Sequence, residues 1–305
     1  MRLFVATLLL AGFTLVRAEA AEPTSSASGR DSSIVVNPSS VDWCQWIVDT
    51  PNFRIYWCPA TGDVRPFAAQ CERLAAISRR RWLGKESAQR WLPKCDVVVH
   101  RGVTEYVACL GPGSQATSGC ATIRLDEGRV VLRRIDLRVD AADWMSESLP
   151  HELMHVVLAD RFSLRRIPPW ADEGIAMLSE STARLNQRLS GLRQSAARGS
   201  LYTFQELIHV ETGPQPAARD AFYGQSLALV SVLLECGPRK QLLDFIAASQ
   251  LEDCDAALRK VYGSRAPIDL ERQFVERSRS ERPFALVHQT LVALSRSPKD
   301  AATAE

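Results

Sequence analysis

The chain has 305 residues, of which 46% are hydrophobic and 24% are charged. This is ordinary globular composition, with enough length for one large domain or two small ones. Its 37 basic and 35 acidic residues leave a formal net charge of +2, so the chain lacks the basic excess that is typical of nucleic-acid-binding proteins.

The first 20 residues have the pattern of a signal peptide. Arg2 supplies the positive charge, residues 3–16 are apolar but shorter than the ~20 residues of a transmembrane helix, and Ala18 and Ala20 form an A-x-A cleavage site. No later run is long and apolar enough to span a bilayer. We therefore expect an exported protein, periplasmic or secreted, with no integral membrane segment in the mature chain and with a flexible leader at 21–42.

Eight cysteines follow the signal peptide, and an even number in an exported chain fits disulfide bonds. The absence of a C-x-x-C pair gives little support to a thiolate metal site. Pairing of neighbours would join Cys44 to Cys58, Cys71 to Cys95, Cys109 to Cys120 and Cys236 to Cys254. Free buried thiols are the alternative for some of them.

The N-terminal half mixes strand and helix signals. Alternation predicts a strand at 53–57, and a helix is predicted from the cap Asp63 to Gly84. Residues 95–100 indicate a buried strand, 111–119 a loop, and 121–139 a hairpin with its turn at 126–128.

From about residue 143 the pattern is helical. A helix at 144–160 either begins near Ser148 or is kinked at Pro150. A second helix follows residues 168–169 and runs through Met177. The remaining helices are predicted at 183–195, 222–236, 239–248, 255–262 and 268–278. Residues 281–305 are expected to be mostly disordered, so the fold class is α+β, with helices after a mixed N-terminal part.

Residues 151–155 read HELMH, and residues 170–174 read WADEG. On a helix, residues four apart share a face, so His151 and His155 can grip one metal ion. Either Asp172 or Glu173 can add a carboxylate, and three protein ligands with one open position are typical of catalytic Zn²⁺. Glu152, beside the first histidine, can serve as general base toward a zinc-activated water.

The positions after the motif exclude one class of zinc peptidase. A metzincin would carry Gly at 158 and His at 161, where this chain has Leu158 and Arg161. Trp170 is expected to pack beneath the two helices. The other histidines, His100, His209 and His288, are expected to have ordinary roles.

Together, LPHELMH at 149–155 and PWADEGIA at 169–176 resemble the gluzincin metallopeptidases, most closely the bacterial peptidase MA-like group. The likeness covers about residues 50 to 280 and is strongest from 149 to 176. It implies a peptidase domain at 43–280 in which a small mixed β-sheet packs on the HExxH helix. It also implies His151, His155 and Glu173 as metal ligands and Glu152 as the base.

The resemblance is incomplete around the ligands. The thermolysin branch has an aspartate four residues after the third ligand, where this chain has Met177, and no Gly-x-Met-Glu-Asn segment of the aminopeptidase branch is present. FYGQS at 222–226 resembles the family's later Tyr-x-x-Ser helix. Tyr223 is either a hydrogen-bond donor to the oxyanion of the reaction or a buried tyrosine with a satisfied hydroxyl. In this fold class, the strand before the motif helix, at 130–139, could bind an extended peptide along a sheet edge.

The sequence therefore predicts an exported zinc metallopeptidase that acts on a peptide or protein substrate. A zinc-containing envelope domain without catalytic activity is the main alternative, and Glu152 argues against it because a structural site needs no base. A third hypothesis is that the protein hydrolyses other amides or esters.

Overall fold

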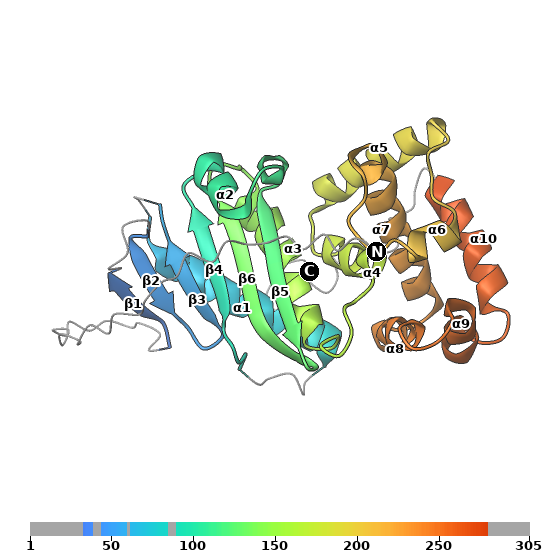
Figure 1. Ribbon diagram of the computed structural model, residues 1–305, viewed down its shortest axis with the longest axis horizontal. Helices are drawn as coiled ribbons and strands as arrows, with labels where there is room; N and C mark the ends of the chain where they lie inside the picture. Colours follow the sequence, from blue (N-terminus) through green and yellow to red (C-terminus); the bar gives the residue numbers. More distant parts are fainter. Residues whose placement is uncertain (1–32, 39–43, 60–61, 85–89, 280–305) are drawn as a thin grey trace, which may run out of the picture. The chain divides into compact units, whose positions relative to one another are not determined.

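The computed structural model describes residues 33–38, 44–59, 62–84 and 90–279. Within them lie a six-stranded mixed sheet and ten α-helices, and the chain after residue 143 is mostly helical. The α+β fold class is therefore confirmed. In Figure 1 the sheet (blue to green) lies beside the C-terminal helices (yellow to red). The expected signal peptide at 1–20 and the tail at 281–305 fall outside the described residues.

The strands are β1 (Val35–Pro38), β2 (Trp46–Asp49), β3 (Phe53–Trp57), β4 (Cys95–His100), β5 (Gly119–Asp126) and β6 (Arg129–Arg138). Their order in the sheet is β1-β2-β3-β4-β6-β5, with parallel pairing of β3 to β4 and of β4 to β6 and antiparallel pairing elsewhere. The predicted hairpin is β5 and β6. The prediction of an edge strand at 130–139 is wrong, because β6 is flanked on both sides and β5 lies at the edge.

Part of the leader expected at 21–42 is also a strand. Val35–Pro38 forms β1 and pairs antiparallel with β2, with Val36 opposite Val48. The β-branched pair Val35 and Val36 suits an extended edge strand, and Pro38 is tolerated at its end. The remaining leader residues lie outside the described part, apart from Ser33 and Ile34.

Two helices cover one face of the sheet. α1 (Val64–Leu83) begins at Asp63, whose side chain accepts a hydrogen bond from the backbone N–H of Arg65, and it ends at Gly84. α3 (Leu149–Ala159) follows a π-helical turn at Trp144–Ser148, so Pro150 lies in its first turn. This is the predicted start near Ser148, because proline fits the first turn without losing a helical hydrogen bond.

α3 separates two hydrophobic cores. Its residues Leu149, Leu153, Val156 and Val157 join the core formed by α1 and the inner face of the sheet. Met154 and Leu158 join a second core made by the C-terminal helices. With apolar side chains on two faces, α3 is held rigidly, and its remaining face carries the polar residues of the motif.

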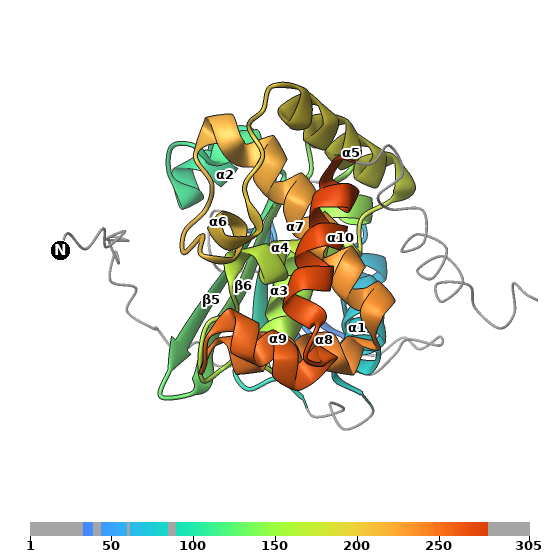
Figure 2. The same cartoon turned by 90° about the vertical axis from the view of Figure 1, so that its right-hand side faces the viewer.

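The second core is formed by the helices that follow α3. They are α4 (Pro169–Met177), α5 (Thr182–Ala197), α6 (Phe204–Ile208), α7 (Arg219–Cys236), α8 (Arg239–Ser249), α9 (Cys254–Tyr262) and α10 (Ala266–Arg279). α7 packs against α4, α5 and α10, and Figure 2 shows it among these helices. Its apolar side chains are almost all buried, as the sequence predicts for 222–236.

A short helix that the sequence analysis does not predict lies on the other face of the sheet. α2 (Val103–Leu110) follows β4 and contacts β4 and β6. Val97 and Val99 point toward α1 and α3, so His100, on the alternate side of β4, points the opposite way. The ring of Tyr106 in α2 packs edge-on against His100 at 5.6 Å.

All eight cysteines are among the described residues, and the structure contains no disulfide between them. Two of the expected pairs are nevertheless neighbours. Hydrogen bonding to Cys44 and burial raise the pKa of the Cys58 thiol, and Cys71 and Cys95 are buried in the same core. Disulfide pairing stays a prediction. Among the described helices, none is both long and apolar enough to cross a membrane.

Candidate metal centre

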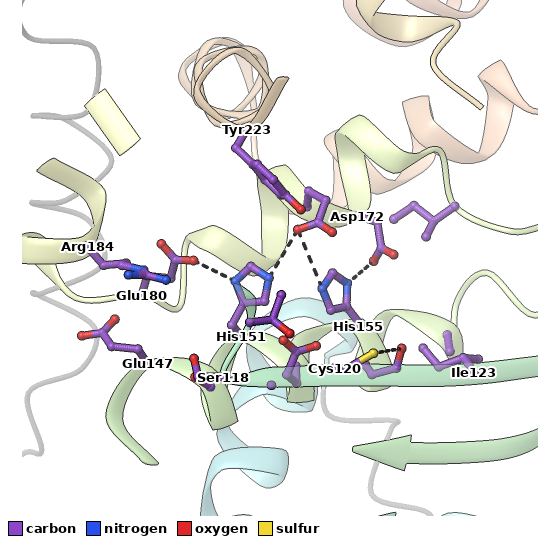
Figure 3. A pocket seen from close by; sticks show the side chains of 18 of the residues that line it. Ser118, Cys120, Ile123, Glu147, His151, His155, Asp172, Glu180, Arg184 and Tyr223 are labelled. Atoms are coloured by element: carbon purple, nitrogen blue, oxygen red, sulfur yellow. Dashed lines mark hydrogen bonds and ion pairs between the residues drawn. The ribbon is translucent and has the colours of Figure 1, made fainter. Parts of the chain in front are cut away.

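The polar face of α3 presents His151, Glu152 and His155 to one cleft. The two imidazoles stack edge-on, with ring centroids 5.1 Å apart, as expected for histidines one helical turn apart. Figure 3 shows both rings pointing away from the sheet, toward α4 and α7.

α4 brings Glu173 to the same place. Its first residue is Pro169, and it packs so closely on α7 that a Cβ at Gly174 would lie 2.6 Å from the carbonyl oxygen of Ser226. Only glycine allows this approach without displacement of the backbone. The residue after Glu173 therefore allows the close packing of α4 on α7.

The three side chains face one another at distances that suit a shared cation. Glu173 Oε2 lies 3.3 Å from His151 Nε2 and 4.0 Å from His155 Nε2, and the three candidate ligand atoms lie within 4.8 Å of one another. Bond lengths of ~2.0 Å to nitrogen and oxygen put two tetrahedral ligand atoms about 3.3 Å apart. The group thus fits a small metal ion with little rearrangement.

Each histidine has a second carboxylate behind it. Glu180 Oε1 lies 2.9 Å from His151 Nδ1, and Asp172 Oδ1 lies 2.8 Å from His155 Nδ1. Such partners fix the orientation of an imidazole and leave its Nε2 toward the metal. Asp172, the alternative third ligand, therefore supports His155 from behind, while Glu173 is the carboxylate that stands with the two Nε2 atoms.

These carboxylates also determine the charge of the site. Burial opposes protonation of His151, but Glu173 and Glu180 outweigh it and raise its pKa to about 10. Burial likewise opposes protonation of His155, and Asp172 and Glu173 raise its pKa to about 9. The site therefore holds positive charge between carboxylates, and a divalent ion can take the place of the two protons.

Arg188 connects Glu180 to Tyr223. Its Nη2 lies 2.9 Å from Glu180 Oε1 and its Nε lies 3.3 Å from Glu180 Oε2, a two-pronged pairing. Its guanidinium also lies over the ring of Tyr223, 4.9 Å from the ring centroid. Burial opposes the charge of Glu180, but His151 and Arg188 lower its pKa to about 2, so it is ionised.

Tyr223 and Glu152 approach the site from opposite sides. Tyr223 is half-buried, lines the cleft and reaches from α7 toward His151 and His155 (Figure 3). Glu152 stands against β5, where a Cβ at Gly119 would lie 2.9 Å from its Cγ. Burial raises the pKa of Glu152, while the two histidines lower it in part.

The cleft around these groups has a volume of about 440 Å³. The edge strand β5 forms one wall, through Gly119, Ala121 and Ile123. The facing wall comes from α5 and α7 and carries three arginines, Arg184, Arg188 and Arg219. A strand edge opposite a charged helical wall can hold an extended chain that lies across the metal centre.

The structure brings together all five residues that the sequence analysis assigned to the site. It adds Glu180 and Arg188, which lie beyond the end of α4 and carried no signal in the sequence. Trp170 is buried in the helical core, as expected. His209 contacts the carbonyl of Gln205 on the surface, and His288 lies outside the described residues.

A scan against protein-family models and a search of curated proteins found no match to this chain. Its function is therefore argued from the geometry of the site.

Proposed function

We propose that this protein is an exported zinc metallopeptidase of the gluzincin type. The observation that carries the proposal is the convergence of His151, His155 and Glu173 on one small space, with Glu152 beside it. Two imidazoles and one carboxylate are the ligand set of many catalytic zinc sites, which keep one position open. A site that served only to hold structure together would need no such open cleft.

His151, His155 and Glu173 would hold the ion, with Asp172 and Glu180 orienting the imidazoles. Bound Zn²⁺ supplies Lewis acidity, which polarises a carbonyl group and makes water more acidic. The absence of thiolate ligands favours an ion that exchanges water readily over a closed structural site.

Glu152 is the proposed general base. Glu152 is half-buried in the wall of the cleft, and desolvation there raises its pKa, which suits a group that first accepts and then donates a proton. It would take a proton from the attacking water and pass it to the leaving amine. Gly119 leaves the space in which this side chain stands.

Tyr223 is the proposed donor to the oxyanion that develops on the scissile carbonyl. Burial raises the pKa of its phenol, so the hydroxyl keeps its hydrogen across the physiological range. The position of Tyr223 in the cleft, across from Glu152, suits this role better than that of a tyrosine enclosed in the core.

The substrate would lie along β5. Among the described strands β5 ends the sheet, so a further extended segment could pair along its outer edge, where Glu152 accepts a hydrogen bond from the backbone N–H of Ala121. Peptide bonds of such a segment would run past Glu152, which stands against β5 at Gly119.

The test is cleavage of a diverse peptide pool by the purified mature protein and by its Glu152→Gln variant. We expect cleavage to fall by at least 100-fold in the variant while its zinc content is unchanged. Glu271→Gln, on the exposed face of α10, is the control and should cleave like the wild type. Equal cleavage by Glu152→Gln would contradict the proposal, and no cleavage by the wild type would favour a silent zinc domain or another amide or ester substrate.

A further inference from the structure

A second group of candidate ligands lies on the opposite face of the sheet. His100 ends β4, Asp136 belongs to β6, and Cys109 lies in α2, the helix that covers this face. Strand β4 pairs directly with β6, so residues far apart in the sequence lie side by side. Asp136 is opposite Val98 on the neighbouring strand, and His100 is two residues farther along β4 on the same face. Nothing in the proposed peptidase reaction uses these residues.

The three ligand atoms are close enough to share one ion. His100 Nε2 lies 2.8 Å and Cys109 Sγ lies 3.8 Å from the same oxygen of Asp136, and all three atoms lie within 4.8 Å of one another. Zinc bonds of ~2.0 Å to nitrogen or oxygen and ~2.3 Å to sulfur place tetrahedral neighbours about 3.3 and 3.5 Å apart. The observed separations lie on either side of these values.

Two members of the group are buried, and the cysteine is exposed to solvent. Asp136 is fully buried and His100 is 5% exposed, whereas Cys109 is exposed. An ion held here would be fixed from below by the sheet, and its remaining position would face solvent. We infer that His100, Cys109 and Asp136 form a second metal site, for a borderline-soft divalent ion such as Zn²⁺.

Arg134 is the competitor for this site. Its Nη2 lies 2.7 Å from Asp136 Oδ1 and 3.0 Å from Cys109 Sγ, and its Nε lies 2.7 Å from Asp136 Oδ2, so a bidentate ion pair must be broken before a metal ion can bind. The Arg134 side chain is 33% exposed and can withdraw toward solvent. Binding exchanges hydrogens for the ion, since the thiol proton is released and the hydrogen of His100 Nε2 must leave that nitrogen.

The site would fasten α2 to the sheet. α2 has few buried side chains, and Tyr106 is its fully buried one. A bond from Cys109 to an ion held by β4 and β6 would add a second anchor one turn farther along the helix. The expected consequence is stabilisation of this face, because the ion would join α2 to β4 and β6.

Disulfide formation between Cys109 and Cys120 would exclude this site. In the structure the two thiols have different partners, since Cys120 Sγ contacts the carbonyl of Ala121 while Cys109 Sγ contacts Asp136 and Arg134. The oxidation state of Cys109 in the exported protein is therefore one measurement that decides the inference.

The experiment titrates the metal-free, full-length mature protein with Co²⁺ and follows thiolate-to-cobalt absorption in the near ultraviolet. The proposed ligands of the first centre contain no sulfur, and the signal does not depend on peptidase activity. Because Cys120 also lines the first cleft, the Cys109→Ser variant assigns the band to the second site. We expect the absorption in the wild type, its loss in Cys109→Ser, and its retention in Cys236→Ser, a matched change at another exposed cysteine. Absence of the band in the wild type, its persistence in Cys109→Ser, or a Cys109–Cys120 disulfide found by mass spectrometry would overturn the inference.

Discussion

Two groups of candidate metal ligands lie on opposite faces of the sheet, and they are built differently. The first takes its residues from α3, which lies between the two cores, and from α4 in the helical core, and each of its histidines has a carboxylate behind it. The second takes its residues from a strand end, a strand and a short helix, and an arginine competes for its space. Support behind the ligands, and a base beside them, distinguish a site suited to chemistry from one suited to binding.

The proposed role of Tyr223 as the oxyanion donor gives the first test of this difference between the two groups. Tyr223→Phe removes one hydroxyl from the cleft and should lower kcat by about 100-fold, with a small effect on KM, because the hydroxyl is used mainly in the transition state. Steady-state kinetics on a cleaved peptide measures this. Tyr202→Phe, whose ring contacts that of Phe222 next to Tyr223, serves as control, and loss of activity in both variants would point to packing instead of catalysis.

The second test concerns Glu180, the carboxylate behind His151. Glu180→Gln should weaken zinc binding at the first centre by about 10- to 100-fold, because the imidazole loses its orienting charge. Competition with a chelator measures the affinity. Glu147→Gln changes another carboxylate of the same cleft, one that accepts a hydrogen bond from the backbone N–H of Ser181, and it should leave the affinity unchanged. Equal affinity in all three proteins would contradict the role of Glu180.

The free energy of unfolding should depend on pH differently in the metal-free and the zinc-bound protein. The pKa values of His151 and His155 are raised to about 10 and about 9, above the ordinary value of 6.5. Their protonation therefore stabilises the metal-free fold fully below pH 6.5, and this stability is lost as the pH rises through 9 to 10. Stabilisation by zinc should grow over the same range, because binding needs deprotonated imidazoles.

Denaturant unfolding at stepwise pH, with chelator and with zinc, measures both trends. His155→Ala should flatten the decline of the metal-free protein. A metal-free protein whose free energy of unfolding rises from pH 6.5 to 10 would show that the pair is neutral when the metal is absent.

The second group should show the smallest effect. With excess Zn²⁺ the Tm of the wild type should exceed that of Cys109→Ser by roughly 5 °C, since an ion that binds the folded state stabilises it. In chelator the two proteins should unfold alike. A Tm difference between the two proteins that persists in chelator would show that the Cys109 thiol itself, and not a bound ion, stabilises the fold.

The sequence was sufficient where spacing alone determines geometry. His151 and His155 stand four apart on a helix, and the helix starts where Pro150 is tolerated. The choice between Asp172 and Glu173 could not come from spacing, because neighbours on a helix point in directions about 100° apart and either could face α3. In the structure Glu173 faces the Nε2 atoms of both histidines, whereas Asp172 lies beside His155 Nδ1.

The remaining features depend on contacts between distant segments. Glu180 and Arg188 lie beyond the end of α4, where no helical period connects them to the motif. The group around Asp136 arises from the strand order, which places β4 beside β6, and His100 therefore has a buried partner that the sequence analysis did not predict. Strand β1 was likewise missed, because four residues in a polar leader form a strand only when β2 pairs with them.

The most direct test of the account is the zinc content of two variants purified from the same host. Cys109→Ser, which lacks the second site, should retain about one zinc ion per chain, and Cys109→Ser combined with His155→Ala should retain none. Circular dichroism would confirm that both are folded. A folded double variant that keeps its zinc, or a Cys109→Ser protein that binds none, would contradict the claim that His151, His155 and Glu173 hold the metal.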